Sequence, residues 1–201
     1  MKRSTKTLTF VLALGVLVLG VSTVMAQKDG GEGKGKGAKS AEKAAEKRSQ
    51  IDAAAQAGLD EVFESSKEAK AFHEKAYGHA VFTNLKFALG VSGGGGSGVA
   101  VETESGRRVY MKMGTAGLGL GLGGQKYQLI FFFEDSKTFQ NFIDKGWEAN
   151  AQASAVAGTK GANAEATFTN GIAVFQITDK GLMLSADIAG TKYWQNKKLN
   201  K

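Results

Sequence analysis

The chain has 201 residues with 28 glycines, no proline and no cysteine, and its formal net charge is +7 at pH 7. Without cysteine it forms no disulfides, and most of the positive charge lies in its N-terminal part, which leaves the remainder close to neutral. A nucleic-acid-binding protein would carry a strong basic face on its fold, so the charge distribution argues against that class.

Residues 1–26 have the layout of a secretory signal peptide. Three basic residues lie among the first six, an apolar run follows from Leu8 to Val21, and small residues surround Met25 at the cleavage position. The apolar run is shorter than the ~20 residues that a membrane-spanning helix needs. We expect cleavage after Ala26 and a protein that is periplasmic or secreted. An uncleaved membrane anchor is the alternative.

Residues 27–38 are rich in Gly and Lys and predict a flexible linker, followed by a single domain over residues 39–201. From Ala38 to Tyr77 the composition is typical of helix, and two stripes occur at helical spacing. The apolar stripe consists of Ala55, Leu59, Val62 and Phe63, and the basic stripe of Lys39, Lys43 and Lys47. The basic stripe is either a solvated helix face or a surface for anionic lipid.

After Gly78 the sequence changes to short β-type runs separated by Gly-containing turns, which predicts antiparallel strands. One helix is expected among them, with Ser136 as N-cap and with Phe139, Phe142 and Ile143 on one face at helical spacing. A hairpin is expected around the TDKG turn at residues 178–181. The candidate strands are residues 81–83, 87–91, 98–101, 108–113, 128–133, 148–156, 172–177 and 182–188.

The stretch TAGLGLGLGGQ at residues 115–125 predicts a strand whose glycines share one face. A two-residue turn at Gly123-Gly124 would place Gly121 opposite Lys126 and Gly119 opposite Gln128. Gly117, Gly119 and Gly121 would then form the floor of a shallow trough. A bare strand face marks close approach by a ligand or by another part of the protein, so a trough filled by side chains from another layer is the alternative.

Two catalytic signatures fit only formally. Gly119 to Gly124 match G-x-G-x-x-G, but a β-type run follows where a dinucleotide site needs a helix. Gly90 to Gly94 match G-x-S-x-G, but no helix pattern and no later His follow. His73 and His79 have no recognised metal spacing, and we expect surface or capping roles for both. The sequence predicts no enzyme, no cofactor and no metal site.

Four stretches together resemble the SYLF domain, a lipid-binding module of bacteria and of eukaryotic membrane-trafficking and actin-patch proteins. Their order and spacing carry the resemblance, which covers roughly residues 50–195 with the preceding helical stretch. The stretches are residues 76–101, the Gly/Leu strand with residues 123–135, residues 139–158 and residues 171–194.

The resemblance implies an α+β fold, in which N-terminal helices precede a Gly-rich, curled antiparallel β-sheet, barrel- or sandwich-like, with one inserted helix. It also implies phospholipid or phosphoinositide binding without catalysis. In eukaryotic members an amphipathic N-terminal helix contributes to membrane contact, and yeast members bind and bundle actin filaments. The expected export signal makes this chain most similar to the stand-alone exported bacterial type, for which cytosolic actin and phosphoinositides are not natural partners.

We therefore predict a non-enzymatic protein of the bacterial cell envelope that binds anionic phospholipid at a membrane surface. The alternative is a structural or protein-interaction module, actin-binding-like by family analogy, with no lipid ligand. We expect the C-terminal lysines to lie in a tail that buries little and to matter at least as much as the N-terminal stripe. The candidate lipid-binding residues are Lys39, Lys43, Lys47, Arg48, Lys126, Gln128, Lys192, Lys197, Lys198 and Lys201.

Overall fold

A computed structural model describes residues 32–148, 168–178, 181–184 and 191–201 of the chain. At residues 32–36, 88–91, 117–122, 147–148 and 181–184 it describes the backbone alone. The predicted signal peptide lies outside the described residues, as do most of the predicted strand 148–156 and the second half of the predicted strand 182–188.

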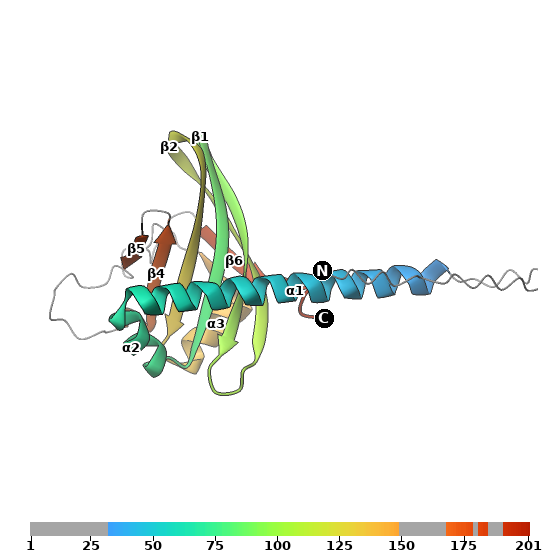
Figure 1. Ribbon diagram of the computed structural model, residues 1–201, viewed down its shortest axis with the longest axis horizontal. Helices are drawn as coiled ribbons and strands as arrows, with labels where there is room; N and C mark the ends of the chain where they lie inside the picture. Colours follow the sequence, from blue (N-terminus) through green and yellow to red (C-terminus); the bar gives the residue numbers. More distant parts are fainter. Residues whose placement is uncertain (1–31, 149–167, 179–180, 185–190) are drawn as a thin grey trace, which may run out of the picture.

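Two helices precede the sheet, α1 (Glu32–Ser65) and α2 (Lys67–Lys75). Ser66 separates them and caps α2, because its hydroxyl accepts a hydrogen bond from the amide of Ala69 at 3.1 Å. α1 begins at Glu32, so the prediction of a flexible linker over residues 27–38 is wrong for its second half. Helix growth is cooperative, so the Ala- and Lys-rich segment that follows extends the helix through glycines that disfavour it. The N-terminal part of α1 projects beyond the sheet (Figure 1).

The strands form one antiparallel sheet, and the predicted α+β class is confirmed. β2 is its centre, since it pairs with β1 along one edge and with β4 and β6 along the other. Helix α3 (Ser136–Lys145) is inserted after β2. The strands are β1 (Gly78–Glu102), β2 (Arg108–Phe133), β3 (Trp147–Glu148), β4 (Ile172–Thr178), β5 (Gly181–Leu184) and β6 (Thr191–Gln195).

β1 and β2 form a long two-stranded ribbon where the sequence predicts several short strands. Their pairing runs from Gly78 opposite Phe133 to Val101 opposite Arg108, with one register shift after Leu89. The predicted turn at Gly123-Gly124 is therefore wrong, because both residues lie within β2. The glycines of this stretch serve a curved strand and not a chain reversal. The hairpin predicted around residues 178–181 is confirmed, since β4 pairs with β5 there.

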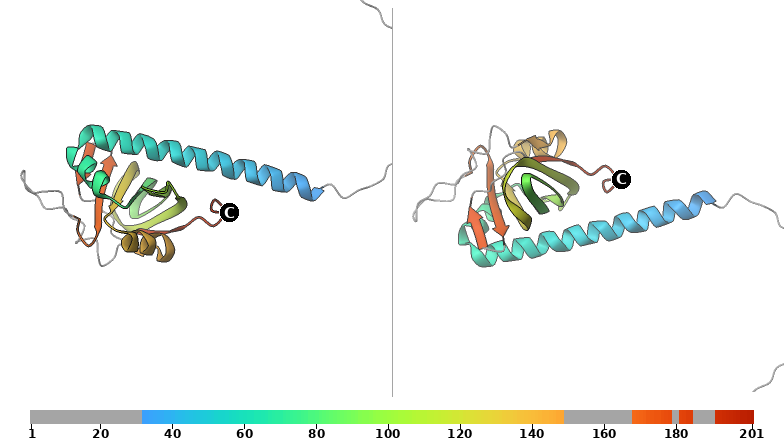
Figure 2. Two further views of the ribbon diagram at one scale, coloured as in Figure 1. Left: turned by 90° about the horizontal axis from the view of Figure 1, so that it is seen from below. Right: turned by 90° about the horizontal axis from the view of Figure 1, so that it is seen from above.

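Three glycines of β1 allow the ribbon to fold back on itself (Figure 2). A Cβ atom at Gly94, Gly96 or Gly98 would lie 2.3–2.5 Å from a backbone oxygen of residues 81–85 in the first half of the same strand. Real Cβ atoms essentially never approach an oxygen so closely, so any other residue would force the two halves of β1 apart. The sequence pattern predicts such close approach for the glycines of β2 and not for Gly94, Gly96 and Gly98.

The curled sheet has an apolar core on each face. Alternate residues of β2 face opposite sides, so that Phe131 and Phe133 pack with α3, while Ile130 and Phe132 pack with α1 and α2. A run of apolar residues without alternation is typical of a strand that is buried on both faces. We call these the α3-side core and the α1-side core.

Each helix contacts the sheet through the face that its sequence indicates. The apolar stripe of α1 is confirmed, because Ala55, Leu59 and Val62 are buried in the α1-side core and Phe63 packs against it. α3 buries Phe139, Phe142 and Ile143 as expected. Its N-cap is Asp135 and not Ser136, since the Asp135 carboxylate accepts the amide hydrogen bond of Thr138 at 2.8 Å.

Two histidines lie between α2 and the sheet. The rings of His73 and His79 are 5.3 Å apart, and they line a cavity of about 240 Å³ together with Asp52 and Arg108. Burial, followed by the positive charges of His73 and Arg108, lowers the pKa of His79 to about 4. Burial also lowers the pKa of His73. The expectation of an ordinary surface or capping residue is therefore wrong for His79, whose ring is largely shielded from solvent at this cavity and is held neutral at pH 7.

The fold-back of β1 predicts opposite effects at two adjacent glycines. A Cβ at Gly96 would lie 2.3 Å from the carbonyl oxygen of Thr83, whereas one at Gly95 would meet only an atom 3.6 Å away. We expect Gly96→Ala to lower the free energy of unfolding by ~1–3 kcal/mol. Gly95→Ala should leave it unchanged or raise it slightly. Thermal unfolding followed by circular dichroism measures both, and equal melting temperatures would contradict the close approach.

The buried histidine predicts a loss of stability in acid. The unfolded chain binds a proton at His79 near pH 6.5, and the folded protein only near pH 4. The free energy of unfolding should therefore fall as pH drops from 6.5 to 4, by about 3 kcal/mol, and then level off for this group. Urea unfolding at several pH values tests this. In His79→Phe most of this loss should disappear, and an acid loss as large as in the wild type would refute the assignment.

Candidate functional site

A cavity of about 360 Å³ lies between α1 and the surface of β1. Ile51, Ala54 and Ala55 line it from α1, and Val81 and Thr83 line it from β1. Protein interiors are normally packed without such spaces, and here the alanines are too short to fill the gap over the sheet. The result is a pocket with mainly apolar walls that opens to solvent.

Two predicted site residues, Lys47 of α1 and Lys126 of β2, line this cavity together. Both are exposed, and Lys126 lies opposite Leu85 in the β1–β2 register. No Asp or Glu lines the cavity, and neither lysine forms an ion pair with any residue that the structure describes. The cavity therefore carries uncompensated positive charge, which favours an anionic ligand.

Exposed apolar side chains stand beside the lysines. Leu85 is 44% exposed and Phe87 is 58% exposed, although most large apolar residues of the sheet are buried. Leu85 and Phe87 follow Val81 and Thr83 at every second position of β1. They therefore lie on the same face of the strand, which α1 covers at Val81 and Thr83. The sequence analysis missed both residues, although the alternation from Val81 to Phe87 is visible in the sequence.

Gln128, another predicted site residue, holds α1 on the sheet instead of facing solvent. Its side-chain amide donates hydrogen bonds to the carbonyl oxygen of Ala54 at 3.0 Å and to the hydroxyl of Thr83 at 3.2 Å. Gly58 makes this contact possible, since a Cβ there would lie 2.8 Å from the Gln128 Oε1 atom. Gln128 thus positions the wall of the cavity and is not free to bind a ligand.

The basic stripe of α1 continues away from the cavity. Lys39, Lys43 and Lys47 are all exposed, with Lys47 at the cavity and the other two further along the projecting part of the helix. Arg48 differs from them, because its guanidinium donates a hydrogen bond to the carbonyl oxygen of Leu199 at 3.1 Å. Arg48 therefore has a structural contact with the C-terminal segment.

The C-terminal segment is bound more firmly than expected. Leu199 is buried in the α1-side core, and the Asn200 side chain bonds both the amide and the carbonyl of Tyr110. The expectation that this tail buries little is wrong for Leu199, whereas Asn200 is held by hydrogen bonds but remains exposed. It holds for Lys197, Lys198 and Lys201, which are exposed, and Lys192 is exposed on β6. The Arg48 contact also brings the two basic ends of the domain to one side.

The predicted trough is not assembled as proposed from the sequence. Gly117 and Gly119 pair with Ser92 and Gly90 of β1, whereas Lys126 and Gln128 pair with Leu85 and Thr83. The glycines of β2 are therefore not opposite Lys126 and Gln128. Gly121 falls at the register shift of the ribbon. What faces these glycines lies outside the described side chains.

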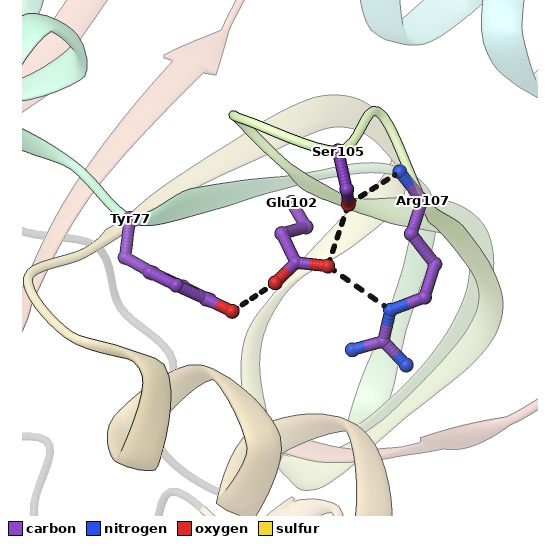
Figure 3. Close-up of polar contacts among 4 residues, drawn as sticks. All are labelled: Tyr77, Glu102, Ser105 and Arg107. Atoms are coloured by element: carbon purple, nitrogen blue, oxygen red, sulfur yellow. Dashed lines mark hydrogen bonds and ion pairs between the residues drawn. The ribbon is translucent and has the colours of Figure 1, made fainter.

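A cluster of polar side chains surrounds Glu102 at the turn between β1 and β2, away from the cavity lining (Figure 3). Its carboxylate accepts hydrogen bonds from Ser105 at 2.6 Å, from Arg107 at 3.2 Å and from the Tyr77 hydroxyl. The bonds from Ser105 and Tyr77 lower the pKa of Glu102. All three donors come from the turn or from the residue that leads into β1. The cluster therefore fixes the closed end of the ribbon.

Among the described residues, no helix is long and apolar enough to cross a membrane. Within the same part of the chain, His, Asp and Glu side chains do not gather in groups of three that would hold a metal ion.

Comparison with known proteins identifies a family for the C-terminal part of the chain. Over 158 residues, which are 79% of this chain, it is 39% identical to "Beta cell expansion factor A" of Aeromonas veronii, and the match spans 60% of that protein's length. Residues 114–201 match the Ysc84 family model, described as "Las17-binding protein actin regulator". That range includes Lys126 but not α1. The SYLF resemblance is thereby confirmed, and residues 114–201 belong to the Ysc84 (SYLF) family.

Proposed function

We propose that the protein binds anionic phospholipid membranes peripherally, in the envelope of the cell that exports it, and catalyses no reaction. One observation carries the proposal: Lys47 and Lys126, which form no ion pair with any described residue, line one cavity together with the exposed Leu85, and the exposed Phe87 follows on the same face of β1. A membrane surface presents anionic headgroups above acyl chains, and this arrangement complements both.

The energies are sufficient for reversible binding. A lysine near an anionic membrane contributes ~1 kcal/mol, and Lys39 and Lys43 add to the same helix face. Full burial of a Leu or Phe side chain stabilises by ~1.5–3 kcal/mol, of which the exposed fractions of Leu85 and Phe87 supply about half. The electrostatic share is screened by salt, and the apolar share is not.

A protein partner is the second candidate. The matched family model is described as a Las17-binding actin regulator, which supports protein recognition by this domain type. The two candidates differ in what they require. A membrane binder needs anionic lipid and responds to the charge of the vesicles, whereas a protein-interaction module does not bind vesicles at all.

Charge reversal at the two lysines tests the electrostatic part of the binding. We expect the double variant Lys47→Glu with Lys126→Glu to bind vesicles of phosphatidylglycerol and phosphatidylcholine at least ~30-fold more weakly at low salt, because two contributions of ~1 kcal/mol are lost. At high salt the difference should shrink. Co-sedimentation measures both. The matched control is Lys67→Glu with Lys70→Glu, two exposed lysines of α2, and it should bind like the wild type.

The C-terminal lysines are tested in the same co-sedimentation experiment with a separate variant. A triple variant with Lys197→Glu, Lys198→Glu and Lys201→Glu changes exposed residues alone and should fold normally. A loss equal to that of the Lys47/Lys126 variant would extend the binding face to the C-terminal segment. Unchanged vesicle binding in every charge variant would refute the electrostatic mechanism.

Polar substitutions at Leu85 and Phe87 test the apolar part of the binding. We expect Leu85→Ser with Phe87→Ser to remove the vesicle binding that persists at high salt, because only the apolar contacts resist screening. Stability should change little, since both side chains are largely exposed. Trp194→Ser is the control, because Trp194 is 42% exposed but lies on β6. Salt-resistant binding that survives in the double variant would contradict the proposed face.

A further inference from the structure

We infer that the cavity between α1 and β1 binds one single-chain amphiphile with an anionic headgroup, taken as a monomer from water. The inference rests on the proposed function insofar as both use Lys47 and Lys126. It goes further, because it assigns a stoichiometric small-molecule ligand to a defined cavity. A membrane surface needs no such cavity.

The volume of the cavity matches a single acyl chain of the ligand. An apolar cavity of about 150 Å³ holds one benzene ring, which is about 25 Å³ for each carbon atom. The 360 Å³ observed here therefore accommodates roughly 14 carbons. That is one acyl chain and not the two chains of a phospholipid. Ligand-binding pockets typically begin at about this volume.

The lining selects an apolar ligand. Ile51, Ala54, Val81 and Leu85 present hydrocarbon to the cavity, and the Thr83 hydroxyl is already engaged with Gln128. A void between packed elements lowers stability, and larger residues at Ala54 would fill it. A cavity that is kept open between a helix and a strand therefore suits an occupant that supplies the missing contacts.

The charge selects the headgroup. Lys47 and Lys126 come from different elements and line the same cavity, and none of the described carboxylates lines it with them. An anionic group on a chain inside the cavity would compensate both ammonium groups while the chain remains on the apolar wall. A neutral or cationic headgroup gains nothing there.

The test uses fatty acids as probes, below their micelle-forming concentrations and without any membrane. Isothermal titration calorimetry with octanoate, decanoate, dodecanoate and tetradecanoate should show one site. Its affinity should rise about fourfold for each added methylene up to ~14 carbons and then level off. The methyl ester of tetradecanoate should bind at least ~10-fold more weakly than the acid. Absence of saturable binding, or equal affinity for acid and ester, overturns the inference.

Two variants locate the site. Ala54→Leu fills the cavity and should weaken tetradecanoate binding at least ~10-fold, while Ala57→Leu, on the exposed face of α1, should not. Melting temperatures at or above that of the wild type confirm that Ala54→Leu is folded. Equal tetradecanoate affinity in the two variants would refute the cavity as the site, even if Ala54→Leu proves more stable.

Vesicle binding separates this inference from the proposed function. Ala54→Leu should still co-sediment with anionic vesicles, because Leu85, Phe87 and the lysines are unchanged. Phe87→Ser alone, at a residue outside the cavity lining, should weaken salt-resistant vesicle binding but retain tetradecanoate. If vesicles bind and fatty acids do not, the inference fails and the proposed function stands. If fatty acids bind and vesicles do not, the proposed function fails and the cavity retains its ligand.

Discussion

The contact of β1 with its own backbone is the constraint on which the rest of the structure depends. A straight strand of 25 residues would be ~80 Å long and would enclose nothing. Because Gly94, Gly96 and Gly98 carry no Cβ, the second half of β1 can lie on the carbonyl oxygens of the first half. The ribbon thereby gains an inside, which α3 fills with aromatic side chains, and an outside, which α1 and α2 cover.

The outer face then decides what is available for binding. α1 covers it closely where Gly58 meets Gln128 and where Leu59 and Val62 are buried. Further along β1 the helix side chains shorten to alanine, and beyond them Leu85 and Phe87 are uncovered. Packing, cavity and exposed surface thus follow one another along a single face of one strand. The candidate site is the zone in which close packing ends.

Sequence patterns predicted those parts in which neighbouring residues determine the structure. The stripe ending at Phe63, the buried face of α3 and the β4–β5 hairpin all follow from local spacing. The glycine-rich runs were misread, because a glycine permits a turn and a close backbone approach equally well. Whether a glycine forms a turn or allows close backbone approach depends on which segment packs against it in the folded protein. Lys47 and Lys126 were predicted for unrelated reasons, and no spacing rule shows that residues so distant in sequence share a cavity.

The hydrogen bond between Arg48 and the carbonyl of Leu199 has a consequence for the order of folding. It joins residues 151 positions apart, whereas the β1–β2 ribbon is closed by a turn at residues 103–107. Closing a long loop costs more conformational entropy than closing a short one. Loop-closure entropy therefore favours formation of the ribbon before the two ends of the domain meet. Until they meet, the middle of α1 lacks the contact that fixes it beside the C-terminal segment, so its final position depends on residues at the other end of the chain.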